Sequence, residues 1–317
     1  MWYSFDKFME ELTVKAPAKI NLHLKVKNRR PDGFHELESI FLALDLGDTL
    51  HLKEKPLKGG QKGALEIDMD APEGWNLAIP MEKNIIFKAV CLFRERTGYG
   101  QGLKIRVEKR IPLGAGLGGG SSDAASTLLA LNLLAGNASP DGKCPLDGDS
   151  LAEMAVLLGS DVPFFVKKCP CAWVSGRGEI IQPIAAPGNF WIVLVNPGFA
   201  SDTAQAYRLL DEYRDAHQIN PCALHSLTPP CAPHSLLPTP NNWHFENDFL
   251  QVFEGAGYQE ILHQLREQGA DFANLSGSGS TCFGIFLDKK KAKSAVTTLS
   301  EKLEKGHVLM SGTSGGN

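Results

Sequence analysis

The segment that most limits how this chain can fold begins at Pro112 and runs to Ser126. It contains five glycines, then two adjacent serines, and a run of strong helix formers begins at Ala124. Residues 103–111, which precede it, alternate apolar and polar side chains as a half-buried strand does. Glycines allow positive φ and a close ligand approach, and the first turn of a helix presents unpaired N–H groups. The order strand, glycine loop, helix therefore predicts a phosphate-binding loop.

Three kinds of phosphate loop share this appearance. A Walker-type loop needs a lysine directly before its serine or threonine, and Gly120 stands there instead. Gly114, Gly116 and Gly119 satisfy the G-x-G-x-x-G pattern of NAD-dependent oxidoreductases. That pattern expects a following parallel strand that ends in an acid, whereas residues 136–145 have the composition of a loop. Protein kinases have a similar glycine pattern, but no H-R-D or D-F-G motif follows here. A tight turn that binds no ligand is the structural alternative to a phosphate-binding loop.

Composition excludes several classes of function. The 317 residues suffice for two domains or one large one, and the formal net charge is −4 with no basic block, so nucleic acid is not expected as a partner. No apolar run approaches the about 20 residues that span a bilayer, so no membrane association is expected. The seven cysteines are scattered, with no recognised zinc spacing, which is typical of a reducing compartment. We therefore expect a cytoplasmic location, and no metal ligand is assigned.

The first strand is expected between Leu12 and Lys27, where alternation places Lys19 and Asn21 on the same face. A turn follows, and a second apolar run is expected to end at Gly47.

Further along the chain, helices are expected over residues 84–97 and 150–158, and a turn at 159–161 is expected to enter a short apolar strand. Residues 217–245 are rich in proline and are expected to form an irregular loop.

Three segments together, residues 17–22, 112–122 and 275–281, resemble the motifs of the GHMP kinase superfamily. Within it, residues 30–37 and 159–164 are similar to the family of 4-diphosphocytidyl-2-C-methyl-D-erythritol kinases. The resemblance extends from about Val14 to Phe286.

This resemblance implies an α+β fold of two domains, residues 1–185 and 186–317, with the active site in the cleft between them. It also implies ATP-dependent phosphorylation, with Mg²⁺ bound to the ATP, of the 2-hydroxyl of a cytidine-diphosphate-linked methylerythritol in the non-mevalonate isoprenoid route. The protein is then a monomer or a homodimer. Another superfamily kinase, for mevalonate or homoserine, is the alternative; an aromatic residue and a histidine at positions 34 and 35 argue against it, because those substrates have no base to stack upon.

The resemblance also implies catalytic roles. Asp161 is the candidate base for the substrate hydroxyl, and Lys19 is expected beside it, where it keeps the carboxylate ionised and stabilises the transferred group. An ordinary strand lysine and a turn or cap aspartate are the structural alternatives. The expected nucleotide-binding residues are Pro112, Leu113, Gly114, Ala115, Gly116, Leu117, Gly118, Gly119, Gly120, Ser121 and Ser122, with Asn84 near the adenine. The serines and Asn84 are equally typical of helix caps.

On the substrate side, the resemblance implies that Phe34 and His35 hold the cytosine by stacking and hydrogen bonding. The family often has tyrosine where Phe34 stands, so stacking is kept but a hydroxyl contact is lost. Tyr207 is expected on the second face of the base, although an aromatic residue there also suits a core position. Asn21 is expected to face the sugar-alcohol portion of the substrate.

Overall fold

A computed structural model of the chain describes residues 3–6, 11–55, 63–73, 75, 79–137, 143–221, 239–253, 257–303 and 305–314. The middle of the proline-rich segment, residues 222–238, lies outside the described residues, and this range includes two of the seven cysteines, Cys222 and Cys231. The described chain divides into two compact units, unit 1 (Met1–Ala18, Gly47–Pro112 and Gly119–Lys168) and unit 2 (Lys19–Leu46, Leu113–Gly118 and Cys169–Asn317). These units do not follow a single boundary at residue 185, because the two long strands β2 (Glu11–Arg29) and β3 (His35–Lys55) each contribute to both. The family-domain boundary at residue 185 stays a prediction.

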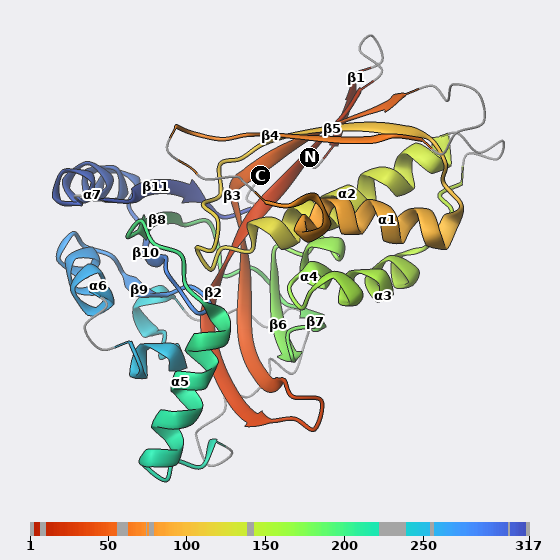
Figure 1. Cartoon of the computed structure of the whole chain (residues 1–317). Helices are drawn as coiled ribbons and strands as arrows, with labels where there is room; N and C mark the ends of the chain where they lie inside the picture. The colour runs from red at the N-terminus through yellow and green to blue at the C-terminus, as the bar shows by residue number, and fades with distance from the viewer. Residues whose placement is uncertain are drawn as a thin grey trace. The chain divides into compact units, whose positions relative to one another are not determined.

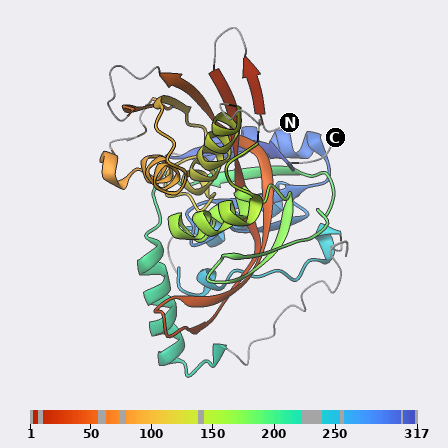
Figure 2. The ribbon, with the colours of Figure 1, turned by 90° about the vertical axis from the view of Figure 1, so that its right-hand side faces the viewer.

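Unit 1 combines strands with a group of helices. Its remaining elements are β1 (Tyr3–Asp6), β4 (Leu65–Asp70), η1 (Met81–Lys83), α1 (Ile85–Thr97), β5 (Gly102–Glu108), α2 (Gly119–Asn137), α3 (Gly148–Leu158) and α4 (Val162–Val166). The end of β3 pairs antiparallel with β5, and β5 pairs parallel with β4. Helix α2 packs against α1 and α4, and α3 packs against α4. Both ribbon views show α1 and α2 beside the strands β4 and β5 (Figures 1 and 2).

The alternation expected for residues 103–111 is present in β5. Leu103, Ile105 and Val107 are fully buried there, whereas Arg106 is exposed. The strand thus presents one apolar face to the unit 1 core and one polar face outward. The chain leaves β5 through residues 109–118 and enters α2 at Gly119, so the strand, loop and helix order is confirmed.

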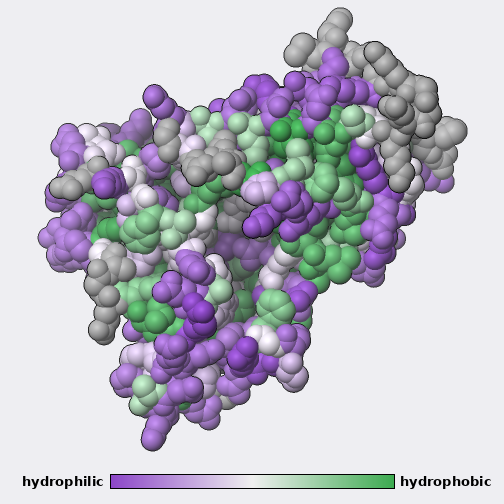
Figure 3. Space-filling model, viewed as in Figure 1, coloured by the Kyte–Doolittle hydropathy of each residue, from purple (hydrophilic) through white to green (hydrophobic). Residues whose placement is uncertain are grey.

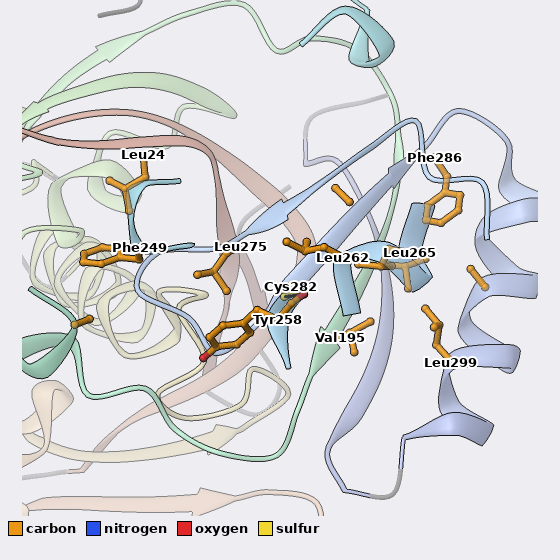
Figure 4. Packing of buried hydrophobic residues seen from close by; sticks show 14 of the residues in the cluster. Leu24, Val195, Phe249, Tyr258, Leu262, Leu265, Leu275, Cys282, Phe286 and Leu299 are labelled. Carbon is orange, nitrogen blue, oxygen red and sulfur yellow. Dashed lines mark hydrogen bonds between the residues drawn. The ribbon is translucent and has the colours of Figure 1, made fainter. Parts of the chain in front are cut away.

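Unit 2 contains a separate antiparallel sheet in the order β11-β8-β10-β9. Its elements, besides the remaining parts of β2 and β3, are β6 (Cys171–Gly176), β7 (Ile180–Pro183), β8 (Trp191–Asn196), α5 (Thr203–Ala216), η3 (Pro240–Asn242), η4 (Asp248–Gln251), α6 (Tyr258–Glu267), β9 (Phe272–Leu275), β10 (Cys282–Phe286), α7 (Lys289–Lys302) and β11 (His307–Gly312). Helices α6 and α7 pack against this sheet. Figure 4 shows Tyr258 and Leu262 of α6 beside Cys282 of β10, in the apolar core of the unit.

The mixture of helices and largely antiparallel strands confirms the α+β fold class. Two local expectations are wrong. Gly47 does not end the second apolar run, because β3 continues through it to Lys55. Residues 162–166 form the short helix α4 rather than a strand. In the described part of the chain, no helix is long and apolar enough to cross a membrane.

Candidate active site

Lys19 and Asn21 lie together in β2, as their spacing predicted. The Nζ atom of Lys19 donates a hydrogen bond of 2.7 Å to Oδ1 of Asn21, and both side chains are buried. The same ammonium group lies 4.5 Å from the centre of the Phe41 ring. Lys19 is therefore not an ordinary strand lysine that faces solvent, because its ammonium group is buried against an aromatic ring and an amide.

The glycine loop is held to unit 2 through its carbonyl oxygens. The backbone N–H of Lys19 donates to the oxygen of Leu117 at 2.9 Å, the Oγ of Ser276 donates to Gly116 at 2.8 Å, and the N–H of Thr281 donates to Ala115 at 3.2 Å. All three hydrogen bonds use loop carbonyls as acceptors. They do not use up the loop N–H groups, which are the donors that a phosphate needs.

Two features of position 116 require glycine, the backbone conformation and the lack of space for a Cβ atom. Its φ is +74°, and a Cβ atom there would overlap the carbonyl oxygen of Ser276 and lie 2.7 Å from that of Gly279. Backbone from the second glycine loop therefore closes directly over the first. The two loops that resembled superfamily motifs, 112–122 and 275–281, are thus in contact within unit 2.

The loop ends in unit 1, where α2 begins at Gly119. Pro112 is buried at the start of the loop, and Gly120 and Ser121 lie in the first turn of the helix. Ser122 is fully buried, and its Oγ has no hydrogen-bond partner among the described residues. A buried hydroxyl without a protein partner is costly unless a ligand or water satisfies it.

A buried ionic cluster supports the entry to this loop. Lys109 Nζ donates to Asp48 and, at 2.7 Å, to Asp123 in the first turns of α2, and all three side chains are buried. Asp48 also accepts the backbone N–H groups of Arg110 and Ile111. The cluster therefore joins the end of β5, a residue of β3 and the start of α2.

The charges in this cluster are strongly perturbed. Burial is the largest influence on Asp123 and raises its pKa to about 7, against the opposing charge of Lys109. Burial lowers the pKa of Lys109, but the carboxylates of Asp123 and Asp48 outweigh it and raise that pKa overall. Lys109 is thus a permanent cation between two carboxyl groups.

Asp161 lies in unit 1 between α3 and α4, not between a helix and a strand as expected. It is the N-cap residue of α4 but makes no side-chain capping hydrogen bond to that helix. Its half-buried carboxylate is therefore not used as an α4 cap. Lys19 belongs to unit 2, so its expected proximity to Asp161 stays a prediction.

Asn84 is the N-cap of α1, where its Oδ1 accepts the N–H of Ile86 at 2.9 Å. Its Nδ2 lies 3.6 Å from the sulfur of Met69. Asn84 therefore caps α1, and its role near the adenine stays a prediction.

The expected base-binding residues lie in unit 2. The ring of His35 stacks on Tyr207 with centroids 5.0 Å apart and 20° between the planes, and its Nε2 lies 2.9 Å from Oδ1 of Asp211. Phe34 is 49% exposed, with the Arg177 guanidinium 4.9 Å from its ring centre. The structure thus joins His35 to Tyr207, whereas a base between Phe34 and Tyr207 stays a prediction.

Comparison with known proteins agrees with this geometry. Residues 84–168 match the GHMP kinases N terminal domain, and residues 254–305 match the GHMP kinases C terminal domain. The 4-diphosphocytidyl-2-C-methyl-D-erythritol kinase of Thermodesulfovibrio yellowstonii is 38% identical over 295 residues, which cover 90% of this chain and 93% of that relative. The chain belongs to this family of GHMP kinases.

Solved structures of GHMP kinases extend the comparison. A crystal structure of 4-(cytidine 5'-diphospho)-2C-methyl-D-erythritol kinase is 30% identical, with a TM-score of 0.70, and covers 96% of this chain and 100% of its own. The mevalonate kinase of L. major in complex with R-mevalonate has a TM-score of 0.66 at 15% identity, over 96% of this chain and 97% of its own, and this similarity concerns the fold alone. As a GHMP kinase, the chain is an ATP-dependent phosphotransferase.

Sequence reasoning did not find Asp211 or the Asp48–Lys109–Asp123 cluster. Asp211 follows Tyr207 by four residues, so an α5 helix would have placed both on one face, but no helix was expected there. The cluster joins residues 61 and 14 positions apart, and nothing local in the sequence indicated it.

Proposed function

We propose that this kinase transfers the γ-phosphoryl group of ATP to the 2-hydroxyl of 4-diphosphocytidyl-2-C-methyl-D-erythritol. The observation that carries this proposal is the backbone hydrogen bond from Lys19 to Leu117. It ties the strand that bears the buried ammonium group to the glycine loop that would hold the phosphates. Family membership supplies the class of substrate.

The proposed chemistry assigns a task to each group. The 2-hydroxyl oxygen forms a bond to the γ-phosphorus, the bond from that phosphorus to the β,γ-bridging oxygen breaks, and ADP leaves. Asp161 accepts the hydroxyl proton, and Lys19 offsets the negative charge on the transferred group. The backbone N–H groups of Gly116 to Ser122 hold the phosphates, and the chemistry needs little more than this positioning.

Residues in unit 1 fit a Mg²⁺-bound nucleotide. The buried Oγ of Ser122, without a partner among the described residues, is an oxygen suited to the metal or to a phosphate. When bound, Mg²⁺ neutralises charge on the β- and γ-phosphates. In this proposal Asn84 contacts the adenine while capping α1.

The substrate side of the proposal lies in unit 2. Phe34 and Tyr207 offer aromatic faces to the cytosine, His35 offers hydrogen bonds, and Asn21 faces the sugar-alcohol portion. We place the reaction in the cytoplasm, in the non-mevalonate isoprenoid route, catalysed by a monomer or a homodimer.

The test is a coupled ADP-release assay with three acceptors, 4-diphosphocytidyl-2-C-methyl-D-erythritol, mevalonate and homoserine, at equal Mg-ATP. The expected result is release with the cytidine compound at least 100-fold faster than with the others, because a site that hydrogen-bonds a base discriminates strongly against ligands without one, by about 10⁴-fold or more in other enzymes. Release with mevalonate or homoserine alone would contradict the proposal and assign the chain to another substrate of the superfamily.

A further inference from the structure

Asp211 is a charged residue in contact with the expected base-binding histidine. Its Oδ1 lies 2.9 Å from Nε2 of His35, and the side-chain exposures are 39% for Asp211 and 8% for His35. Tyr207 and Asp211 are four residues apart in α5, so they lie on the same side of the helix. Tyr207 contacts the face of the His35 imidazole, and Asp211 contacts the edge of that ring.

Helix α5 is firmly held at this place. Ala206 and Leu210 belong to the apolar core of unit 2, and Tyr207 packs edge-on against Phe249 with ring centres 5.0 Å apart. Near the end of the helix, the buried Arg214 pairs with Asp248 at 2.7 Å. Residues that bind a ligand are positioned best by an element that cannot shift.

The outer side of α5 is polar. Figure 3 shows mostly hydrophilic residues at the bottom of the view, where Figure 1 shows this helix. The side chain of Asp211 is itself half exposed. An ionised carboxylate only accepts hydrogen bonds, so the nitrogen of His35 that faces it must carry the hydrogen.

We propose that Asp211 is a positioning residue, which keeps the hydrogen of neutral His35 on Nε2 and leaves Nδ1 as an acceptor for the 4-amino group of a pyrimidine. This inference rests on the proposed function and concerns how the site selects the base of its substrate. Cytosine carries a donor at position 4, whereas uracil carries a carbonyl oxygen there. Two acceptors cannot share a hydrogen bond, so the site favours aminopyrimidine diphosphates over oxopyrimidine diphosphates.

The tautomer is tested first, without any substrate. Two-bond ¹H–¹⁵N correlation spectra of the full chain at about pH 8.5, above the ordinary titration range of imidazole, distinguish a protonated ring nitrogen from an unprotonated one. The expected result is a hydrogen on Nε2 of His35. A hydrogen on Nδ1 instead would overturn the inference, whatever the enzyme phosphorylates.

The second test compares Asp211→Asn with the matched control Asp215→Asn, whose exposed side chain lies one turn further along α5. An asparagine amide either donates or accepts, so it no longer fixes the tautomer. Calorimetric titration with CDP and UDP should give about tenfold weaker CDP binding in Asp211→Asn, the value of one hydrogen bond, and a smaller CDP-to-UDP ratio. The control should keep the ratio of the unchanged protein.

Kinetics separate positioning from structural damage. In Asp211→Asn, KM for the cytidine substrate should rise about tenfold while kcat and KM for ATP change less than about twofold, because the variant loses binding of the base and not the chemistry. An unchanged CDP-to-UDP ratio would overturn the inference. No turnover by the unchanged protein, with CDP still preferred to UDP, would instead refute the proposed function and leave the inference standing.

Discussion

Nζ of Lys19 donates a hydrogen bond to Oδ1 of Asn21, and the neighbouring Ser39 fixes the orientation of the Asn21 amide. Ser39 donates its hydroxyl hydrogen to the carbonyl oxygen of His23, so it must accept from Nδ2 of Asn21 at 3.0 Å. The amide of Asn21 therefore presents its oxygen, and not its nitrogen, to Lys19. A buried chain of three side chains thus holds one ammonium group in place, which is the preorganisation that charge stabilisation requires.

Replacing Lys19 by methionine should remove this charge and keep most of the volume. We expect kcat to fall by about 10²–10³-fold, as it does when one preorganised electrostatic group is removed, with a smaller change in KM for ATP. Lys25→Met is the matched control, since Lys25 is also buried in β2 but pairs with Glu246. Steady-state kinetics of both variants should show a loss of kcat in the first alone; equal losses would make the effect one of strand stability.

Replacing Asp161 by asparagine should abolish phosphoryl transfer and preserve ATP binding. Asparagine cannot accept the proton of the substrate hydroxyl, and loss of a positioned base costs about 10²–10⁴-fold in rate. Asp161 makes no capping hydrogen bond to α4, so the change removes no cap from that helix. The control is Asp147→Asn, at the N-cap of α3, where the side chain does accept a hydrogen bond from Ser150. Turnover of Asp161→Asn within about tenfold of normal would refute the base assignment.

Replacing Gly116 by alanine should weaken ATP binding by more than tenfold. The new Cβ would overlap backbone oxygens of Ser276 and Gly279, so one loop must move away from the other. Gly98→Ala is the control, because Gly98 has nearly the same φ, +72° against +74°, and no atom within 4 Å of the added Cβ. In both variants, alanine at a positive φ destabilises the folded state by about 1 kcal/mol. Only Gly116→Ala adds a steric overlap between the new Cβ and backbone oxygens. Nucleotide titration and thermal unfolding of the two variants separate these terms.

Local periodicity was enough to predict much of this fold. The strand at residues 12–27, the helix at 84–97 and the strand, loop and helix around Gly116 all follow from residue patterns over short windows. The failures also have local causes. Gly47 suggested a strand end, but its Cβ position lies 2.7 Å from the carbonyl oxygen of Ala16, so glycine here permits close backbone approach within a strand.

The segment from Val162 to Val166 is apolar at every position and fully buried, so it carries no period that distinguishes a strand from a helix. Its proline at the second helical position is compatible with a helix start. Contacts between residues far apart in the sequence could not be predicted, because local patterns carry no information on which distant segments pack together. His35 and Asp211 are 176 residues apart, and only tertiary packing brings them together.

The buried ion pairs of Lys109 should stabilise the fold of unit 1. Lys109→Met leaves Asp48 and Asp123 buried without their cation, and breaking a buried pair costs about 3–5 kcal/mol. Lys104→Met is the control, because its partner Asp68 is exposed and such surface pairs contribute about 0–1 kcal/mol. Urea unfolding at neutral pH should show the large difference; a loss below about 1 kcal/mol for Lys109→Met would mean that the cluster does not stabilise the loop entry.

His23 should make the folded state sensitive to acid. Its Nδ1 accepts the backbone N–H of Glu246 at 3.1 Å, and its Nε2 is buried without a partner among the described residues. Burial, partly opposed by Glu38, lowers its pKa from 6.5 to about 4. Between these two values the unfolded chain binds more protons than the folded one, so stability is full above pH 6.5 and falls as the pH drops toward 4. We expect this histidine to contribute a loss on the order of 3 kcal/mol between pH 7 and pH 4, and His23→Gln, which cannot be protonated, should lose correspondingly less. Urea unfolding of both proteins across this range measures the difference, and parallel curves for the two would mean that His23 is protonated equally easily in the folded and unfolded chain.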